Sequence, residues 1–249
     1  MRITDLNRQG GIGANCLKVE IGSFRFIIDC GLHPKENGRN ALPDFSRLQG
    51  EKLDLIFLSH CHLDHLGGLP VLLREHPDTP VITSAESHLL FERLLHNSVN
   101  VMQRQRAELG IGEYPLFTHA EIKHGARKVL PMRCGIPRVL ESLDGDRITF
   151  TLYPAGHIPG AVGILLEYRK RKIFFTGDVL FSDTTILDGA RFPKGEVDTL
   201  VLETTRGMTE RDENQSRESE IRRLLQKIRQ VCRQGGSVLI PVFALGRMQ

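Results

Sequence analysis

Residues 60–65 bring four side chains that could bind metal ions into one hexapeptide, His-Cys-His-Leu-Asp-His. Alternate residues of an extended segment share a face, so His60 and His62 can point to one place. Asp64 and His65 can then turn toward a second place nearby. Imidazole and carboxylate ligands, with no thiolate required, suit two zinc ions held for hydrolysis better than a closed structural site. The expected chemistry is metal-assisted hydrolysis.

Two residues of the same kind follow later strand-like runs. Residues 148–153 lead into Pro-Ala-Gly-His157, and a very apolar run leads through Thr-Gly to Asp178. The hexapeptide itself follows the apolar run 53–58, which predicts a buried strand. Taken alone, His157 could be solvated and Asp178 could belong to an ordinary Gly-Asp turn. Since a site for two metal ions needs more ligands than the hexapeptide carries, both are predicted to be ligands.

Two further carboxylates stand at expected strand ends. Asp29 ends the run 24–28 and could hold a ligand histidine in the correct tautomer, or it could cap its own turn. Glu203 follows the run 197–202 and could support the ligands or hold a proton donor. A purely local role stays open for both residues.

The apolar and polar pattern of the rest of the sequence predicts the strands and helices that position these residues. Runs of two-residue periodicity and β-branched composition predict strands, and the spacing of leucines near residues 89–95 predicts a long helix. Strands in hairpin-like runs with helices between them favour an α/β sandwich of two facing mixed sheets, with helices outside. The expected strands are 16–21, 24–29, 53–58, 80–83, 148–153, 162–167, 172–175, 198–202 and 237–242, and the expected helices are 66–75, 85–108 and 216–234.

Bulk properties are those of an ordinary water-soluble globular protein. The chain has 249 residues, a hydrophobic content of 40%, a charged content of 25% and a formal charge of +3. This charge is too small to indicate nucleic-acid binding by itself. Five scattered cysteines without CxxC spacing are typical of reduced thiols. With no signal-like apolar core or membrane-length run, the expected location is cytoplasmic, with no membrane partner.

Several motifs together resemble the metallo-β-lactamase superfamily. Within it they look most like the β-CASP RNA nucleases of the 3′-end-processing endonuclease type. The hexapeptide indicates only the superfamily, whereas Glu203 with its following loop and the segment from Pro241 to Arg247 narrow the resemblance to β-CASP. The matching segments are residues 28–31, 58–68, 155–157, 176–178, 202–207 and 235–247.

This resemblance implies an αββα sandwich and a role for each candidate. His60, His62 and His157 would bind one zinc ion, Asp64 and His65 would bind the other, and Asp178 would bridge the two. Asp29 would support the ligands, and Glu203 would hold a catalytic histidine in place. Asp64, Asp29 and Glu203 are therefore the expected catalytic residues.

The resemblance also predicts the domain organisation. Residues 1–240 would form the metallo-β-lactamase-like domain, and residues 241–249 would begin a β-CASP insertion. In the family two more histidine motifs follow that insertion, and this sequence ends at Gln249 before them. The sequence is expected to be a fragment of a longer protein, and a natural minimal form is the alternative.

The leading functional hypothesis is zinc-dependent hydrolysis of RNA phosphodiester bonds, in processing or degradation, by a hydroxide that two metal ions activate. Single-stranded RNA is the expected partner. One alternative is a hydrolase of the same fold acting on a thioester, lactone or β-lactam, and another is a non-catalytic subunit of an RNA-processing complex. The basic residues of helix 216–234 could contact RNA, but a solvated helix face explains them equally well.

Overall fold

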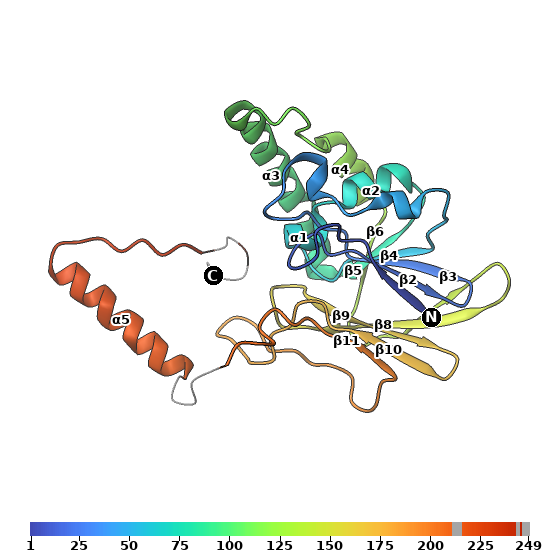
Figure 1. Ribbon diagram of the computed structural model, residues 1–249. Helices are drawn as coiled ribbons and strands as arrows, with labels where there is room; N and C mark the ends of the chain where they lie inside the picture. The colour runs from blue at the N-terminus through green and yellow to red at the C-terminus, as the bar shows by residue number, and fades with distance from the viewer. Residues whose placement is uncertain (211–215, 243–244, 246–249) are drawn as a thin grey trace. The chain divides into compact units, whose positions relative to one another are not determined.

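The structure is a computed structural model that describes residues 1–210, 216–242 and 245. The chain forms two compact units, Met1–Glu203 and Thr204–Gln249. All the strands that the structure describes lie in the larger unit (Figure 1). The expected division into residues 1–240 and 241–249 remains a prediction, and most of the second segment lies outside the described residues.

The first sheet of the larger unit has the strand order β1-β2-β3-β4-β5-β6. Its first three strands are antiparallel neighbours, and β3 to β6 pair in parallel. Parallel neighbours bring their carboxyl ends to one edge of the sheet, which is where the hexapeptide follows β4. The strands are Arg2–Asp5 (β1), Leu17–Ile21 (β2), Phe24–Ile28 (β3), Leu55–Phe57 (β4), Val81–Ser84 (β5) and Val129–Met132 (β6).

The second sheet has the order β11-β10-β9-β8-β7. Its strands pair antiparallel except for β10 with β11, which are parallel. Residues 169 and 170 form the tight turn between β9 and β10. The strands are Arg138–Glu141 (β7), Arg147–Pro154 (β8), Val162–Tyr168 (β9), Arg171–Phe175 (β10) and Thr199–Val201 (β11).

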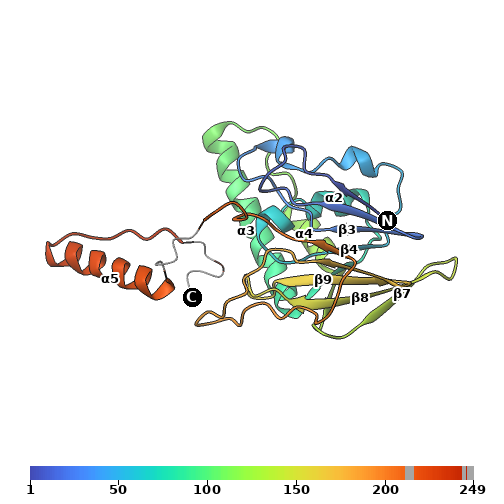
Figure 2. The same ribbon diagram turned by 60° about the horizontal axis from the view of Figure 1, so that its bottom comes forward.

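The two sheets face one another across a buried apolar core, and Figure 2 shows them as adjacent layers. Phe57 of the first sheet lies at its centre, with its ring 5.5 Å from Phe26 and 5.2 Å from Phe150 of the second sheet. Side chains alternate between the two faces of a strand, so the next residues along the same strands face the other way. The predicted sandwich of two mixed sheets is confirmed.

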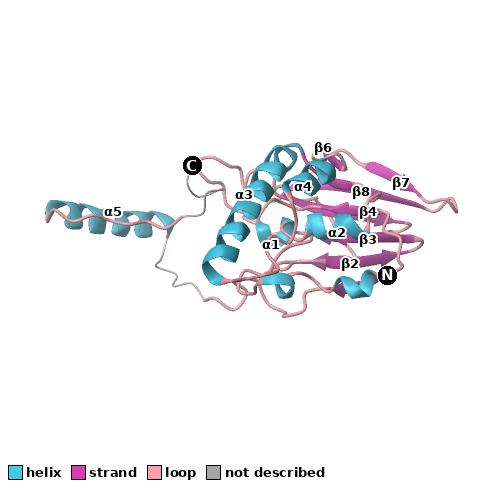
Figure 3. Cartoon of the chain, turned by 90° about the horizontal axis from the view of Figure 1, so that it is seen from above, coloured by secondary structure: helices cyan, strands magenta, loops and turns pink. Residues whose placement is uncertain are grey.

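Helices cover the outer face of the first sheet (Figure 3). Leu72, Phe91 and Ile122 pack from these helices against Ile27 and Ile56 of the sheet. The longest helix starts at a Ser84 cap, whose hydroxyl accepts from the N–H of Ser87. The helices are Leu63–Leu66 (α1), Leu69–Glu75 (α2), Ala85–Leu109 (α3) and His119–Ala126 (α4), and two short 3₁₀ turns lie at Gly38–Ala41 and Phe45–Leu48.

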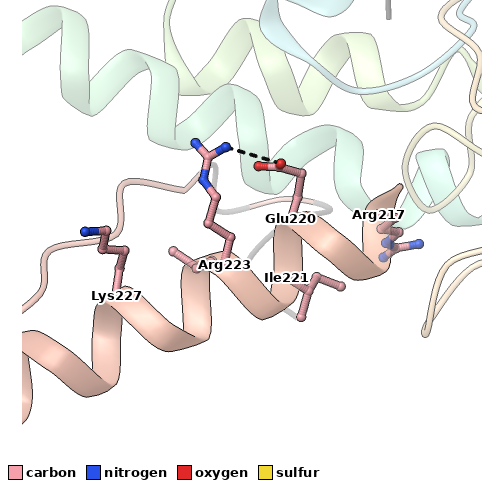
Figure 4. Close-up of a pocket in the computed structure, with 6 residues that line it drawn as sticks. Arg217, Glu220, Ile221, Arg223 and Lys227 are labelled. Atoms are coloured by element: carbon pink, nitrogen blue, oxygen red, sulfur yellow. Dashed lines mark hydrogen bonds and ion pairs between the residues drawn. The ribbon is translucent and has the colours of Figure 1, made fainter. Parts of the chain in front are cut away.

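The smaller unit contains the amphipathic helix α5, Arg217–Arg233, which buries none of its residues. Figure 4 shows its side chains, with Glu220 and Arg223 forming an ion pair of 3.4 Å. Ile221 and Leu224 are about half exposed, so the apolar face of this helix is not covered within the described part of the unit. Whether its basic residues contact RNA stays a prediction.

One predicted strand is wrong. Residues 237–242 are extended but form no strand in the described structure. A strand needs a neighbour for its backbone hydrogen bonds, and the described residues of the smaller unit offer no other strand. The poorly patterned stretch 109–146 contains α4, β6 and β7, which the sequence pattern did not separate.

Candidate metal centre

The hexapeptide leaves the first sheet directly after β4. His60 is fully buried, and His62 immediately precedes α1, which carries Asp64 and His65. Cys61 points the other way, and its Sγ donates to the carbonyl oxygen of Ser87 at 3.2 Å. Burial raises the pKa of the Cys61 thiol to about 12, so it stays protonated. The Cys61 side chain therefore faces away from the candidate ligands.

Three imidazoles converge on one point. His62 Nδ1 lies 3.1 Å from His60 Nε2 and 3.1 Å from His157 Nε2. The Oδ2 atom of Asp178 lies 3.5 Å from His157 Nε2 and 3.9 Å from His60 Nε2. All four residues offer ligand atoms within 4.8 Å of one another. This is the set expected around the first metal ion.

Two loops from the second sheet deliver His157 and Asp178 to this point. Gly156 pairs with Val179 in an isolated antiparallel bridge, which joins the loop after β8 to the loop after β10. Gly156 has φ of +70°, and a Cβ there would overlap the backbone oxygen of Leu180. Only glycine allows both the left-handed turn and this close approach.

The remaining expected ligands lie beside this group. His65 Nε2 is 3.3 Å from Asp178 Oδ1 and 3.7 Å from Asp64 Oδ2. The two carboxylate oxygens of Asp178 therefore face different histidines, Oδ2 toward His60 and His157 and Oδ1 toward His65. Asp64 and His65 are not part of the tight four-residue group. A second ion position is thus indicated but is less compact than the first.

Asp29 orients the His65 ring through Nδ1, the nitrogen that faces away from the centre. Its Oδ2 lies 2.8 Å from His65 Nδ1, which leaves Nε2 as the nitrogen that faces the centre. Asp29 itself accepts from the backbone N–H of Ser59 and from its hydroxyl, each at 2.7 Å. This carboxylate thus contacts a candidate ligand, as the resemblance implied, and does not merely cap its own turn.

Ser59 links the two halves of the centre and was not singled out in the sequence. Its hydroxyl donates to Asp29 and lies 3.0 Å from His60 Nδ1. Ser59 therefore holds the His60 ring through Nδ1, while Nε2 of the same ring faces His62 and Asp178. The only sequence signal for this role of Ser59 is its position directly before His60.

Glu203 lies beside the Asp178 loop. Its Oε1 accepts from the N–H of Val179 at 3.2 Å, and its own N–H donates to the hydroxyl of Thr176 at 3.3 Å. The carboxylate thereby supports Val179 after Asp178, and the backbone N–H of Glu203 supports Thr176 before it. A role in holding a catalytic histidine remains a prediction.

Asn15 is the second residue that the sequence did not indicate. Its Nδ2 lies 3.0 Å from His65 Nε2 and donates to the carbonyl oxygen of Asp64 at 3.2 Å. It reaches the centre from the loop before β2, 50 positions from His65 along the chain. Isolated asparagines in glycine-rich loops are common, so its type and position carried no signal.

The three histidines of the tight four-residue group are held in the neutral form. Burial lowers the pKa of His60, His62 and His157, and neighbouring imidazoles lower that of His60 further. Neutral imidazole is the form that binds a metal ion.

His65 behaves in the opposite way. Burial alone lowers its pKa, but the carboxylates of Asp29 and Asp178 outweigh burial and raise it well above the usual value. Burial raises the pKa of Asp178, but its bond to His65 and the other histidines lower it. Without metal ions, this pair therefore carries a proton that an ion at His65 would displace.

The donor set fits divalent metal ions. Three neutral imidazoles crowd their nitrogens against one carboxylate, an arrangement that a shared cation would satisfy better than hydrogen bonds among the rings. His60, His62, His157 and Asp178 would hold one ion, and Asp178, Asp64 and His65 would hold another.

Comparison with known proteins decides the family. The model of the metallo-beta-lactamase superfamily matches residues 10–230. The chain belongs to this superfamily. In the metallo-β-lactamase domain, the histidines and carboxylates described above form the candidate centre, whose donor set is that of a metal-dependent hydrolase.

Several curated relatives are similar over nearly the whole chain. The probable RNase MJ4 of Methanocaldococcus jannaschii is 31% identical over 96% of this chain. Cleavage and polyadenylation specificity factor 73 of Drosophila melanogaster is 30% identical over the whole of this chain. Endoribonuclease ysh-1 of Neurospora crassa is 32% identical over 98% of this chain. These matches confirm the resemblance to β-CASP nucleases.

The chain spans only part of each relative. It covers 52% of the archaeal protein, 34% of the Drosophila protein and 28% of the Neurospora protein. The similarity therefore describes this metallo-β-lactamase domain and not the remainder of those proteins.

Proposed function

We propose that this protein hydrolyses phosphodiester bonds of single-stranded RNA with two zinc ions. The observation that carries the proposal is the placement of Asp178, whose two carboxylate oxygens face His60 and His157 on one side and His65 on the other. This arrangement is the one needed to hold two ions next to each other. Relatives named as ribonucleases support RNA as the substrate.

The residues of the chain prepare this site in three ways. His60, His62 and His157 present neutral nitrogens, since burial lowers their pKa. Asp29 keeps the hydrogen of His65 on Nδ1 and leaves Nε2 toward the centre. Asp64 adds a carboxylate near the same nitrogen. When bound, two divalent ions supply an activated water at neutral pH and neutralise charge on the phosphate.

Zinc is favoured over other divalent ions by the donor types. Imidazole and carboxylate ligands at a three-histidine site are typical of zinc, whereas magnesium and calcium prefer oxygen ligands only. The cytoplasmic location expected from composition remains a prediction. In the part of the chain that the structure describes, no helix has the length and apolarity needed to cross a membrane.

Cleavage of end-labelled single-stranded RNA, with zinc added, tests this function. The parent protein should cut the RNA, and a chelator should stop it. Asp64→Ala removes a ligand and should lower the rate at least about 100-fold. Asp78→Ala is the matched control, because the Asp78 side chain is fully exposed and precedes β5, at the sheet edge opposite to the one where the hexapeptide follows β4.

Two results would contradict the proposal. One is Asp64→Ala protein that cuts RNA as fast as the parent. The other is zinc-loaded parent protein that hydrolyses a chromogenic thioester or lactam and leaves RNA intact, which would instead support the small-molecule hydrolase. Zinc uptake without turnover of either substrate would support the non-catalytic alternative.

A further inference from the structure

Asn15 is fixed at the edge of the candidate centre by its own backbone. Its N–H donates to the carbonyl oxygen of Asp64 at 2.9 Å, and its carbonyl oxygen accepts from the N–H of Gly31 at 3.0 Å. Asp64 is a candidate ligand, and Gly31 belongs to the loop that begins with Asp29. The segments that build the centre therefore also set the position of this half-buried residue.

The orientation of its side-chain amide follows from its neighbours. The carbonyl oxygen of Asp64 can only accept, so the amide nitrogen of Asn15 must face it, at 3.2 Å. The same nitrogen lies 3.0 Å from His65 Nε2. In the neutral form of His65, which is the form that binds a metal ion, Asp29 keeps the hydrogen on Nδ1, so the Nε2 atom carries a lone pair. One N–H of Asn15 thus points at Asp64 and the other at Nε2.

A metal ion at His65 would need the same lone pair. His65 Nε2 is the ring nitrogen that faces Asp178 at 3.3 Å and Asp64 at 3.7 Å, the carboxylates that would share the ion. With this nitrogen occupied, the second N–H of Asn15 loses its acceptor. Leaving a polar hydrogen without a hydrogen-bond partner costs free energy. This N–H of Asn15 would therefore donate to an oxygen atom that binds beside the ion.

The bound substrate supplies such an oxygen. The ion pairs that the described residues make with Asp64 and Asp178 all involve histidines. A neutral amide donor at this place can stabilise an anionic oxygen without competing with the metal ions for the carboxylates. Donors fixed in advance at the site of growing negative charge are the most effective kind.

We propose that Asn15 is a catalytic residue that donates its second side-chain N–H to a non-bridging oxygen of the scissile phosphate. The identity of the substrate rests on the proposed function, but the role as a donor to a phosphate oxygen does not. No covalent bond to Asn15 forms or breaks.

Phosphate binding tests this role without any turnover. Inorganic phosphate is titrated by calorimetry into zinc-loaded parent, Asn15→Ala and Asn7→Ala proteins. Asn7 is the matched control, because its side-chain amide also bonds to backbone oxygens of the same loop, those of Gly11 and Gly13. Asn15→Ala should bind phosphate about 10- to 100-fold more weakly than the parent, as expected for loss of a hydrogen bond to a charged group. Asn7→Ala should bind it like the parent.

Metal content and unfolding temperature are measured for each variant, so that loss of metal or fold is not mistaken for loss of the donor. If Asn15→Ala does not fold, the side-chain amide resonances of Asn15 in ¹⁵N-labelled parent protein decide instead. They should shift when zinc is added and again when phosphate is added.

The outcomes separate this inference from the proposed function. Equal phosphate affinity in parent and Asn15→Ala, with zinc retained, overturns it, as does a parent protein that takes up no zinc or binds no phosphate. If phosphate affinity depends on Asn15 but RNA is not cut, the donor role holds and the proposed function fails. If RNA is cut, Asn15→Ala should lower kcat about 10²-fold.

Discussion

At the scale of single residues, one side-chain type plays two electrostatic roles in this centre. His60 lies among other imidazoles, and burial lowers its pKa. His65 lies between Asp29 and Asp178, whose charges outweigh burial and raise its pKa. The hexapeptide alone gives no sign that the pKa values of His60 and His65 shift in opposite directions, so the difference comes from their neighbours in the fold.

This difference predicts the order in which metal ions leave on acidification. A raised pKa means that protons compete for His65 already above its usual value of about 6.5, whereas protons compete for His60, His62 and His157 only below that value. The ion at Asp64 and His65 should therefore leave first as the pH falls. Metal content after dialysis at stepwise lower pH checks this, and simultaneous or reversed loss would contradict it.

The same shifts fix the sign of the pH dependence of folding without metal. The raised pKa of His65 contributes stability below about pH 6.5 that is lost as the pH rises through the folded-state value. The lowered pKa values of His60, His62 and His157 act in the opposite sense, since protonation favours the unfolded chain as the pH falls below about 6.5. The two effects act on opposite sides of about pH 6.5, so together they predict that the metal-free protein is most stable near that pH.

Residue types at strand ends were enough to find every candidate ligand but not their supports. His157 and Asp178 were predicted because a site for two metal ions needs more ligands than the hexapeptide carries and both follow apolar runs, and the structure brings both to the hexapeptide. Ser59 and Asn15 were missed, because serine and asparagine are frequent in loops. Only their distances to His60 and His65 show their roles.

At the scale of elements, the centre depends on how closely the loop after β3 approaches α1. The N–H of Cys30 donates to the carbonyl oxygen of His65 at 2.7 Å, and the N–H of Leu32 donates to that of Leu63 at 2.8 Å. A Cβ on Gly31, between them, would overlap the backbone of Asp64. The helix that carries Asp64 and His65 therefore sits directly against this loop.

Gly31→Ala should displace α1 and weaken the second ion position. The overlap is with backbone atoms, which cannot rotate away, so we expect a loss of stability of about 1–3 kcal/mol. Zinc should fall from two ions toward one per chain. Gly112→Ala is the control, because a Cβ there meets no atom within 4 Å. Denaturant unfolding and metal analysis measure both effects, and unchanged zinc content in Gly31→Ala would contradict the expectation.

Strand prediction succeeded for the strands that lead into the centre, each of which has a partner, and failed for an apolar run that has none among the described residues. The runs before Asp29, the hexapeptide and Asp178 are all strands of a sheet. Residues 237–242 have similar apolar composition but form no strand in the described structure. Composition reports the tendency to be extended, whereas a strand also requires a neighbour that composition does not specify.

At the scale of the whole larger unit, the core between the sheets holds the two halves of the centre together. The first sheet carries the hexapeptide, and the second carries His157 and Asp178. Phe57 is fully buried between the sheets, three residues before His60. Packing at this position therefore couples stability to the geometry of the centre.

Phe57→Ala should cost about 3–5 kcal/mol of unfolding free energy, since it removes a large ring and leaves a cavity between the sheets. Phe181→Ala is the matched control, because the Phe181 side chain is 63% exposed. Chemical denaturation of both variants measures the difference. A cost for Phe57→Ala no larger than that for Phe181→Ala would show that the contact between the sheets does not hold the unit together.

The sequence by itself determined the chemistry of the centre, because imidazole and carboxylate side chains after apolar runs already specify metal ligands and strand ends. It also determined the sandwich of two sheets, since alternating and apolar runs specify which faces are buried. Only the tertiary structure decided which way Asp178 divides its oxygens, and that Asn15 and Ser59 belong to the centre. These contacts join segments as far apart as residues 60 and 178, and distances of that kind depend on how loops pack, which no local pattern encodes.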